Sequence, residues 1–373
     1  MRFVDEYRAP TKVMELIACL KERAPLLSYT PSRPLRIMEI CGGHTHAIFR
    51  FGLDQLLPDN IEFIHGPGCP VCVLPMGRID NCIEIASHPE TLFCTFGDAL
   101  RVPGKQGSLL DARARGADIR VVYSPLDALQ LARDNPERKV VFFGLGFETT
   151  MPTTALTLQQ AKADNIDNFF LFCQHITIIP TLRSLLVQPD NSIDAFLAPG
   201  HVSMVIGVDA YQFIATEFQR PLVIAGFEPV DMLQSVLMLV EQKIAKQPQI
   251  ENQYRRVVPD AGNALAQKAI AEVFMLDGDA EWRGLGIIGE SGVALTPDYQ
   301  QFDAERYFHP QPQKTSDDPR ARCGDVLTGR CKPHHCSLFG TVCNPQSAFG
   351  ALMVSSEGAC AAWYQYRGQE IHS

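Results

Sequence analysis

Two short glycine-containing stretches hold the residue types that redox and metal chemistry require. They are Cys41-Gly-Gly-His-Thr-His46 and Gly66-Pro-Gly-Cys-Pro-Val-Cys72. Each follows a short apolar run, at 35–40 and 61–65, which indicates a strand that ends where the loop begins. Open α/β sheets bind ligands at the carboxyl ends of their strands. Three thiols and two imidazoles on such loops therefore predict a redox centre, a soft-metal site, or both.

The Cys69 and Cys72 pair has two interpretations. A Cys-x-x-Cys sequence brings two sulfurs within reach of a disulfide, and a helix that follows favours a thiolate. The same spacing forms half of a zinc site, for which Cys41 with His44 or His46 would supply the other half. Cys41, unshielded by the glycines after it, suits a metal ion that keeps positions open for other ligands. At most one of the two histidines is expected as a ligand, and His46 is expected to bond a main-chain carbonyl.

The remaining cysteines form two groups. Those in apolar or helical patterns are expected in the core, namely Cys19, Cys82, Cys94 and Cys173. Those in the C-terminal region are Cys323, Cys331, Cys336, Cys343 and Cys360. The C-terminal spacing is too loose for a zinc ribbon or finger. Four of these five thiols would suit an iron–sulfur cluster, and a structural zinc site is the alternative.

Strands and helices alternate in the segments that must position these loops. Strands of a first set are expected at 36–40, 61–65, 91–96 and 119–123, and strands of a second set at 140–143, 169–172, 195–198 and 222–225. This alternation is typical of parallel sheets with helical crossovers. A matching hexapeptide follows the fourth strand of each set: Pro125-Leu-Asp-Ala-Leu-Gln130 and Pro229-Val-Asp-Met-Leu-Gln234. The two sets therefore indicate an internal duplication.

We expect an α/β protein with two duplicated parallel-sheet domains that face a cleft, plus a small C-terminal domain. The expected domains are 1–137, which carries an N-terminal helix and both cysteine loops, 138–249, and 250–373, which carries the cluster. Gly144-Leu-Gly-Phe-Glu-Thr149 lacks the third glycine of a dinucleotide fingerprint, and we interpret it as the duplicate of the Cys41 loop. Other polar loop residues that could line the cleft are Asp98, Lys105, His201 and Glu228.

Composition excludes several classes of function. The net charge of −9 argues against a nucleic-acid-binding protein, which needs a basic face. No apolar run reaches the roughly 18 residues of a membrane span. The charged start of the chain does not fit a signal peptide. Twelve cysteines in a cytoplasmic protein are more consistent with metal ligands or catalytic thiols than with disulfides. We therefore expect a cytoplasmic protein.

Taken together, the motifs resemble the HypD family of hydrogenase maturation proteins over essentially the whole chain. The resemblance rests on Cys41-Gly-Gly-His-Thr-His46, Gly66-Pro-Gly-Cys-Pro-Val-Cys72, Gly144-Leu-Gly-Phe-Glu-Thr149 and Met353-Val-Ser-Ser-Glu-Gly-Ala-Cys360. It implies a scaffold that, with a partner called HypC, assembles the iron centre of nickel–iron hydrogenases. There iron acquires two cyanides and one carbon monoxide before delivery to the hydrogenase large subunit. Cyanide comes from carbamoyl phosphate through HypF and HypE, so HypE is expected to dock transiently.

The resemblance also implies roles for individual cysteines. Cys41 would bind the iron jointly with a cysteine of HypC, and Cys69 with Cys72 would form a thiol–disulfide pair. That pair would exchange electrons with a [4Fe–4S] cluster. The family pattern places the cluster on Cys323, Cys336, Cys343 and Cys360, which leaves Cys331 as the extra thiol. We count His44 with the three loop thiols among the residues expected to take part in the chemistry.

Such a protein works within a maturation complex rather than as a stand-alone enzyme. The alternative is a free-standing iron–sulfur thiol–disulfide reductase, in which Cys69 and Cys72 reduce a partner and Cys41 is incidental. A Cys41 variant separates the two, because only a scaffold loses its iron-carrying ability with that thiol.

Overall fold

The structure is a computed structural model that describes residues 5–311 and 318–367. It has two parallel sheets, two small antiparallel sheets of two strands each and a C-terminal region. The first sheet has the order β2 (Ile61–His65), β1 (Leu35–Glu39), β7 (Ala195–Pro199), β8 (Leu222–Ala225) and β9 (Ile250–Asn252). The second sheet has the order β4 (Ile119–Val121), β3 (Thr91–Thr95), β5 (Lys139–Gly146) and β6 (Phe169–His175). The expected α/β class with parallel sheets is confirmed.

The two sheets are interleaved along the chain, so the predicted grouping of strands was wrong. Strand β1 pairs with β7, and β3 pairs with β5, so each sheet takes two strands from each predicted set. The boundary expected between 137 and 138 does not separate the sheets. Strand β9, which begins at residue 250, also belongs to the first sheet. Apolar periodicity identifies a buried strand but not its neighbour, and the segment between β2 and β3 crosses from one sheet to the other.

The same strand order supports the duplication. When β1 to β4 are matched in turn with β5 to β8, the sheets read β2-β1-β7-β8 and β6-β5-β3-β4, which is one pattern used twice. The matched hexapeptides begin the helices α6 (Pro125–Asp134) and α11 (Pro229–Ala245), with proline at the first helical position in both. Each repeat therefore gives its first two strands to one sheet and its last two to the other.

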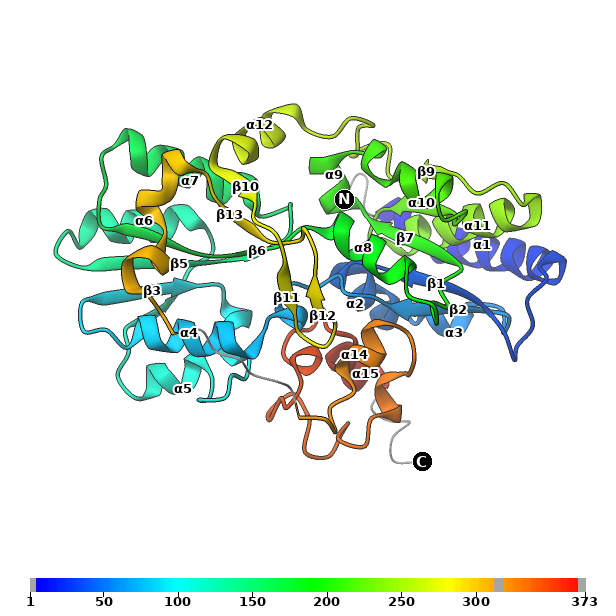
Figure 1. The fold of residues 1–373 in the computed structure, drawn as a ribbon. Helices are drawn as coiled ribbons and strands as arrows, with labels where there is room; N and C mark the ends of the chain where they lie inside the picture. The colour runs from blue at the N-terminus through cyan, green and yellow to red at the C-terminus, as the bar shows by residue number, and fades with distance from the viewer. Residues whose placement is uncertain (1–4, 312–317, 368–373) are drawn as a thin grey trace.

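Helices cover both sheets, as Figure 1 shows. Those of the first half are α1 (Pro10–Arg23), α2 (Gly42–Phe51), α3 (Leu53–Leu56), α4 (Met76–Ala86) and α5 (Leu109–Ala114). Those of the second half are α7 (Met151–Ala163), α8 (Ile178–Leu186), α9 (Gly200–Ile206) and α10 (Gln212–Thr216). No helix among the described residues is long and apolar enough to cross a bilayer.

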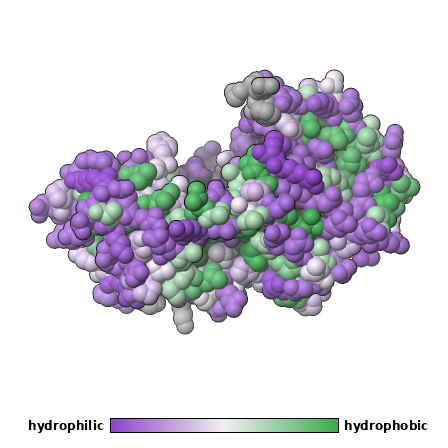
Figure 2. All heavy atoms as spheres, turned by 90° about the horizontal axis from the view of Figure 1, so that it is seen from above, coloured by the Kyte–Doolittle hydropathy of each residue, from purple (hydrophilic) through white to green (hydrophobic). Residues whose placement is uncertain are grey.

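The rest of the chain comprises α12 (Ala264–Val273), β10 (Phe274–Leu276), β11 (Ala280–Trp282), β12 (Gly286–Ile288), β13 (Val293–Leu295), α13 (Ala304–Phe308), α14 (Cys323–Leu327) and α15 (Ala359–Arg367). It packs partly on the lobe of the second sheet, where α12 contacts α7 and α13 contacts β6, and partly below the junction of the sheets (Figure 1). The C-terminal region with α14 and α15 lies below the junction, beside α2 (Figure 1). Seen from above, the molecule has two lobes with a hollow between them (Figure 2). This arrangement places the ends of β1 and β2 against the C-terminal region.

Candidate functional site

Cys41 lies between the end of β1 and the first residue of α2. Burial raises the pKa of its thiol to about 12, with further contributions from the negative charges of Glu357 and Glu39. The main-chain N–H groups of His44 and Gly43, at the start of α2, act in the opposite direction and favour the thiolate. A metal cation deprotonates a coordinating thiol outright. The surroundings of Cys41 therefore suit a thiolate whose charge is balanced by a bound cation.

Cys69 and Cys72 form a reduced dithiol inside the protein. Both side chains are buried, and the Cys72 thiol donates to the Cys69 sulfur at 2.7 Å. A disulfide bond is about 2.05 Å long, so oxidation needs only a small movement of the two sulfurs. Burial, followed by the hydrogen bond to Cys69, raises the pKa of the Cys72 thiol. Cys72 is therefore held as a neutral thiol beside the sulfur of Cys69, with which it can close to a disulfide.

The two cysteine loops touch each other, as their positions after neighbouring strands predict. Gly42 N–H donates to the Gly68 carbonyl oxygen at 3.1 Å. A Cβ atom on Gly68 would lie 2.1 Å from the main-chain nitrogen of Cys41, and a Cβ on Gly42 would lie 3.1 Å from the Cβ of Cys69. Only glycine at position 68 permits this approach. The loop that carries Cys41 and the loop that carries the dithiol are therefore in direct contact.

A buried carboxylate beneath Cys41 is not among the residues predicted from the sequence. Glu39 is fully buried, and one of its oxygens accepts from Cys41 N–H at 3.0 Å. Its other oxygen accepts from the Thr45 hydroxyl and lies 2.8 Å from His65 Nδ1. The sequence signal was a single carboxylate at the end of an apolar strand, where burial requires hydrogen-bond partners. Glu39 fixes the start of the Cys41 loop.

The two histidines of the first motif bond to main-chain carbonyls. His44 Nε2 lies 3.0 Å from the Gly226 oxygen, and its buried Nδ1 has no hydrogen-bond partner among the described residues. Burial lowers the pKa of His44, which favours a neutral ring. His46 Nδ1 lies 3.2 Å from the Ser356 oxygen, so the expectation of a carbonyl partner for His46 is confirmed.

An aromatic side chain that sequence reasoning missed stands beside the Cys41 loop. Phe227 follows β8, and its ring stacks on His201 at 4.0 Å and packs against His44 at 4.7 Å. A Cβ on Gly43 would lie 3.1 Å from the same ring. Phe227 thus separates two imidazoles and walls one side of the loop. A lone phenylalanine after a strand carried no signal that distinguishes it from core.

The other polar residues expected along the cleft form local contacts. Asp98 accepts from the Ser355 hydroxyl at 2.7 Å. Lys105 N–H donates to Asp80, and Glu228 pairs with Arg8. Asp98 thus contacts the segment before Cys360, while Lys105 bonds through its main chain and Glu228 pairs with the N-terminal part of the chain.

Glu357 connects the Cys41 loop with the C-terminal region. A Cβ on Gly42 would lie 2.5 Å from the Cβ of Glu357, so this side chain lies directly over the start of α2. Burial, with the charge of Asp98 next in size, raises the pKa of the Glu357 carboxyl. A Cβ on Gly358 would lie 3.0 Å from the Cys72 sulfur. The segment before Cys360 therefore covers both Cys41 and the dithiol.

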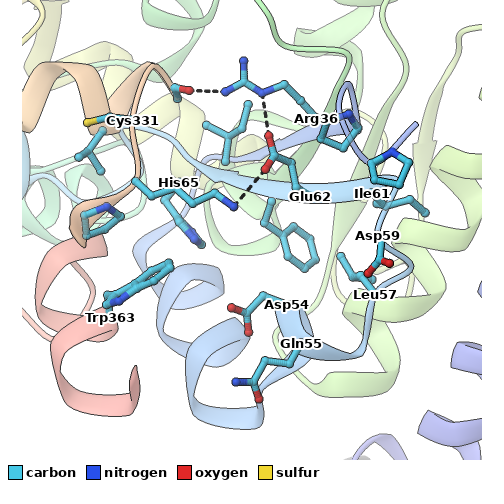
Figure 3. Close-up of a pocket in the computed structure, with 18 of the residues that line it drawn as sticks. Arg36, Asp54, Gln55, Leu57, Asp59, Ile61, Glu62, His65, Cys331 and Trp363 are labelled. Atoms are coloured by element: carbon cyan, nitrogen blue, oxygen red, sulfur yellow. Dashed lines mark hydrogen bonds and ion pairs between the residues drawn. The ribbon is translucent and has the colours of Figure 1, made fainter. Parts of the chain in front are cut away.

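Four C-terminal thiols line one cavity. It is small, about 20 Å³, and its lining includes Cys323, Cys336, Cys343 and Cys360. Cys331 lines a different cavity, beside Lys332 and Trp363 (Figure 3). The four lining thiols are those that the family pattern assigns to the cluster.

The thiol arrangement differs from that of a single-ion site. Within residues 5–311 and 318–367, no group of three or more His, Cys, Asp or Glu side chains could hold one metal ion. A [4Fe–4S] cluster instead takes one thiolate on each of four irons, so its ligands surround a space rather than meet at a point. A cavity lined by four thiols fits that donor set.

Of the four cysteines expected in the core, three are at least half-buried and one is exposed. Cys82 and Cys94 are buried and Cys173 is half-buried, but Cys19 is exposed. Cys19 was predicted wrongly because it lies on the outer face of α1, where the amphipathic pattern leaves it outside the stripe formed by Ile17 and Leu20.

The loop after β5, which we interpret as the duplicate of the Cys41 loop, holds a buried carboxyl and no thiol. Glu148 follows β5 and accepts from Ile178 N–H at 3.0 Å, while its second oxygen has no partner among the described residues. Burial raises the pKa of Glu148 to about 7.

Comparison with known proteins gives a consistent family. The family described as "HypD: Hydrogenase formation hypA family" matches residues 12–367. The chain is 78% identical to the hydrogenase maturation factor HypD of Escherichia coli strain K12, over 99% of both chains. It is 55% identical to the HypD of Rhodobacter capsulatus, over 99% of both chains, and 44% identical to that of Cupriavidus necator, over 98% of this chain and 97% of the relative.

Proposed function

The chain belongs to the HypD family of hydrogenase maturation factors, and on that premise we propose that it is the scaffold on which the iron of a nickel–iron hydrogenase receives its cyanide and carbon monoxide ligands. Cys41 binds the iron, which is the cargo, together with a cysteine of HypC. A soft thiolate suits low-spin ferrous iron. The carboxylates of Glu39 and Glu357 near Cys41 support this role, because their negative charges favour a cation bound at the thiolate.

One observation carries the proposal: the Cys41 loop contacts the dithiol loop, and the dithiol contacts the segment that leads to the C-terminal thiols. Cys41 touches the loop of Cys69 and Cys72 through the Gly42 to Gly68 hydrogen bond. The dithiol in turn lies under the segment that leads to Cys360. An iron ligand, a two-electron dithiol and a thiol-lined cavity are thus adjacent.

The dithiol supplies or accepts electrons next to the iron. Oxidation of Cys69 and Cys72 to a disulfide releases two electrons and two protons, and reduction takes both back. A [4Fe–4S] cluster, when bound by Cys323, Cys336, Cys343 and Cys360, supplies one-electron chemistry beside that pair. Glu357, in the segment that leads to Cys360, lies against the start of α2 beside Cys41.

The burial of the dithiol disfavours a free-standing reductase. A reductase that acts on a partner protein must expose one sulfur for attack on the partner's disulfide. Cys69 is only 4% exposed and Cys72 only 1%. The pair therefore serves a centre inside this protein. The protein itself works in the cytoplasm, within a complex that includes HypC and transiently HypE.

Complementation of a strain that lacks its own family member tests the proposal. The native chain and Cys19→Ala, a control at an exposed cysteine, restore hydrogenase activity, whereas Cys41→Ala restores none. Immunoblots confirm equal amounts of the three proteins. Full activity with Cys41→Ala would contradict the role of Cys41 as the iron ligand.

A further inference from the structure

Residues 5–8, which precede α1, pack on the loop that follows β8. The Arg8 guanidinium donates to both carboxylate oxygens of Glu228, from Nη2 at 2.7 Å and from Nε to the second oxygen. The two residues are 220 positions apart in the chain. A guanidinium that meets a carboxylate through two hydrogen bonds fixes orientation as well as distance. This ion pair therefore ties the segment before α1 to the loop that contains Phe227.

Tyr7 makes a second contact with the same region. The centre of its ring lies 3.9 Å from the guanidinium carbon of Arg256, whose two terminal nitrogens donate to Asp231 at 2.8 and 2.6 Å. Asp231 is fully buried in the first turn of α11, and one of its oxygens would lie 2.3 Å from a Cβ on Gly226. The segment before α1 is therefore anchored on either side of the loop 226–228.

The anchored loop forms one wall of the Cys41 site. The Gly226 oxygen lies 3.0 Å from His44 Nε2, and the Phe227 ring packs on the His44 ring at 4.7 Å. A Cβ on Gly43 would lie 3.1 Å from the Phe227 ring and 3.7 Å from the Cys41 sulfur. The ring and the thiol therefore both border Gly43, and a shift of the loop would move the ring away from the thiol.

Arg8 also contacts the helix that begins beside Cys41. Its guanidinium carbon lies 5.9 Å from the ring centre of Phe51, the last residue of α2, within the range of a cation–π contact. The side chains of Arg8 and Glu228 are 46% and 19% exposed, and ion pairs at such exposure contribute little to the stability of a fold. The expected effect of Arg8 is therefore on the position of the loop.

We propose that Arg8 is a positioning residue for the Cys41 site, which through Glu228 holds the Phe227 ring against the Cys41 loop. The ring limits the approach of other molecules to the thiol from that side, and it fixes the surroundings of an ion bound there. Lysine does not replace Arg8 fully, because an ammonium group lacks the planar fork of a guanidinium. The proposal stands on the ion pair and on the contacts of Phe227, and only its infrared readout rests on the proposed function.

A double-mutant cycle on the metal-free full chain tests the proposal. Iodoacetamide labels the protein, and peptide mass spectrometry measures the rate at Cys41 in the native chain, Arg8→Gln, Glu228→Gln and the double variant. Each single variant is expected to raise the rate about fivefold, because the loop opens more often without the ion pair. The double variant is expected to add no further increase, since both changes remove one interaction. Arg8→Lys should lie between the native chain and Arg8→Gln.

The direction of the two single effects separates position from charge. A change in charge alone would shift the two rates in opposite directions, because a nearby cation favours a thiolate and a nearby anion disfavours it. Arg23→Gln is the matched control, since Arg23 pairs at 3.0 Å with Glu241 near the other end of α11 and is 51% exposed. It is expected to leave the rate at Cys41 unchanged. The buried Cys82 should stay unreactive in every variant.

Infrared spectra of the variants with HypC extend the test to the loaded protein. Arg8→Gln is expected to keep the cyanide bands but to shift or broaden them, because the ring beside the bound ion is less fixed, while Arg23→Gln keeps native bands. Absence of bands in the native chain would contradict the proposed function alone, since alkylation uses metal-free protein.

Four results would overturn the role of Arg8. They are unchanged or slower alkylation of Cys41 in Arg8→Gln, single effects that add in the double variant, an equal increase in Arg23→Gln, and an increase at Cys82 that matches the one at Cys41. The last of these would show that the whole fold opens rather than one loop.

Discussion

The surroundings of Cys41 disfavour the thiolate when no cation is bound. Burial and two carboxylates raise the pKa of its thiol to about 12, although helix N–H groups favour the thiolate. Nucleophilic attack needs the thiolate. The metal-free residue should therefore be unreactive in spite of its glycine neighbours.

Pulse alkylation of the metal-free protein at pH 8 tests this point. Cys41 is expected to react with iodoacetamide at least about a hundredfold more slowly than the exposed Cys19, because its pKa lies several units above that of a free thiol. Glu357→Gln removes one of the opposing charges and should speed the reaction of Cys41 alone. Peptide mass spectrometry measures both rates. Equal rates at Cys41 and Cys19 would contradict the raised pKa.

At the scale of elements, the site depends on contact between the loop after β1, which carries Cys41, and the loop after β2, which carries Cys69 and Cys72. Gly68→Ala places a Cβ 2.1 Å from the Cys41 nitrogen and is expected to separate the loops, with a loss of stability of about 2–3 kcal/mol and loss of maturation. Gly97→Ala is the matched control in the loop after β3, where the nearest atom lies 3.7 Å away. Urea unfolding and hydrogenase complementation measure the two effects. Native behaviour of Gly68→Ala would show that the approach is not needed.

The end of β5 should give a distinct pH dependence of stability. Glu148 has a pKa raised from 4.5 to about 7 by burial, so its contribution is fully present below pH 4.5 and is lost as pH rises through 7. The loss amounts to about 3 kcal/mol. Glu148→Gln removes this slope. The native chain should therefore be less stable to urea at pH 8 than at pH 5, and Glu148→Gln should reduce this difference. The same pH difference in both proteins would contradict the raised pKa.

At the scale of the whole molecule, the two sheets depend on each other. Each sheet holds strands from both halves of the chain, so a fragment of residues 1–137 contains two strands of each sheet and completes neither. We expect fragments 1–137 and 138–249 to be unfolded alone by circular dichroism, and the full chain to unfold as one unit. A cooperative transition in an isolated fragment would contradict the interleaved topology.

The sequence was sufficient for local structure and insufficient for partners in space. Apolar periodicity located the strands, and the glycine loops after β1 and β2 located the thiols. Apolar periodicity did not predict that β1 pairs with β7, because the buried strands of a parallel sheet are all similarly apolar. Phe227 was missed because its contact with His44 joins segments that only the fold brings together. Glu39 lies two residues before Cys41, but its contact with His65 depends on the register between β1 and β2.

An infrared spectrum of the anaerobically purified protein, alone and with HypC, tests the central claim most directly. The account predicts cyanide and carbon monoxide stretching bands in the native chain that vanish in Cys41→Ala, while about four irons and four sulfides per chain remain, as one [4Fe–4S] cluster requires. Persistence of the bands in Cys41→Ala would contradict the role of Cys41. Zinc in place of iron, with no such bands even in the complex, would contradict the scaffold itself.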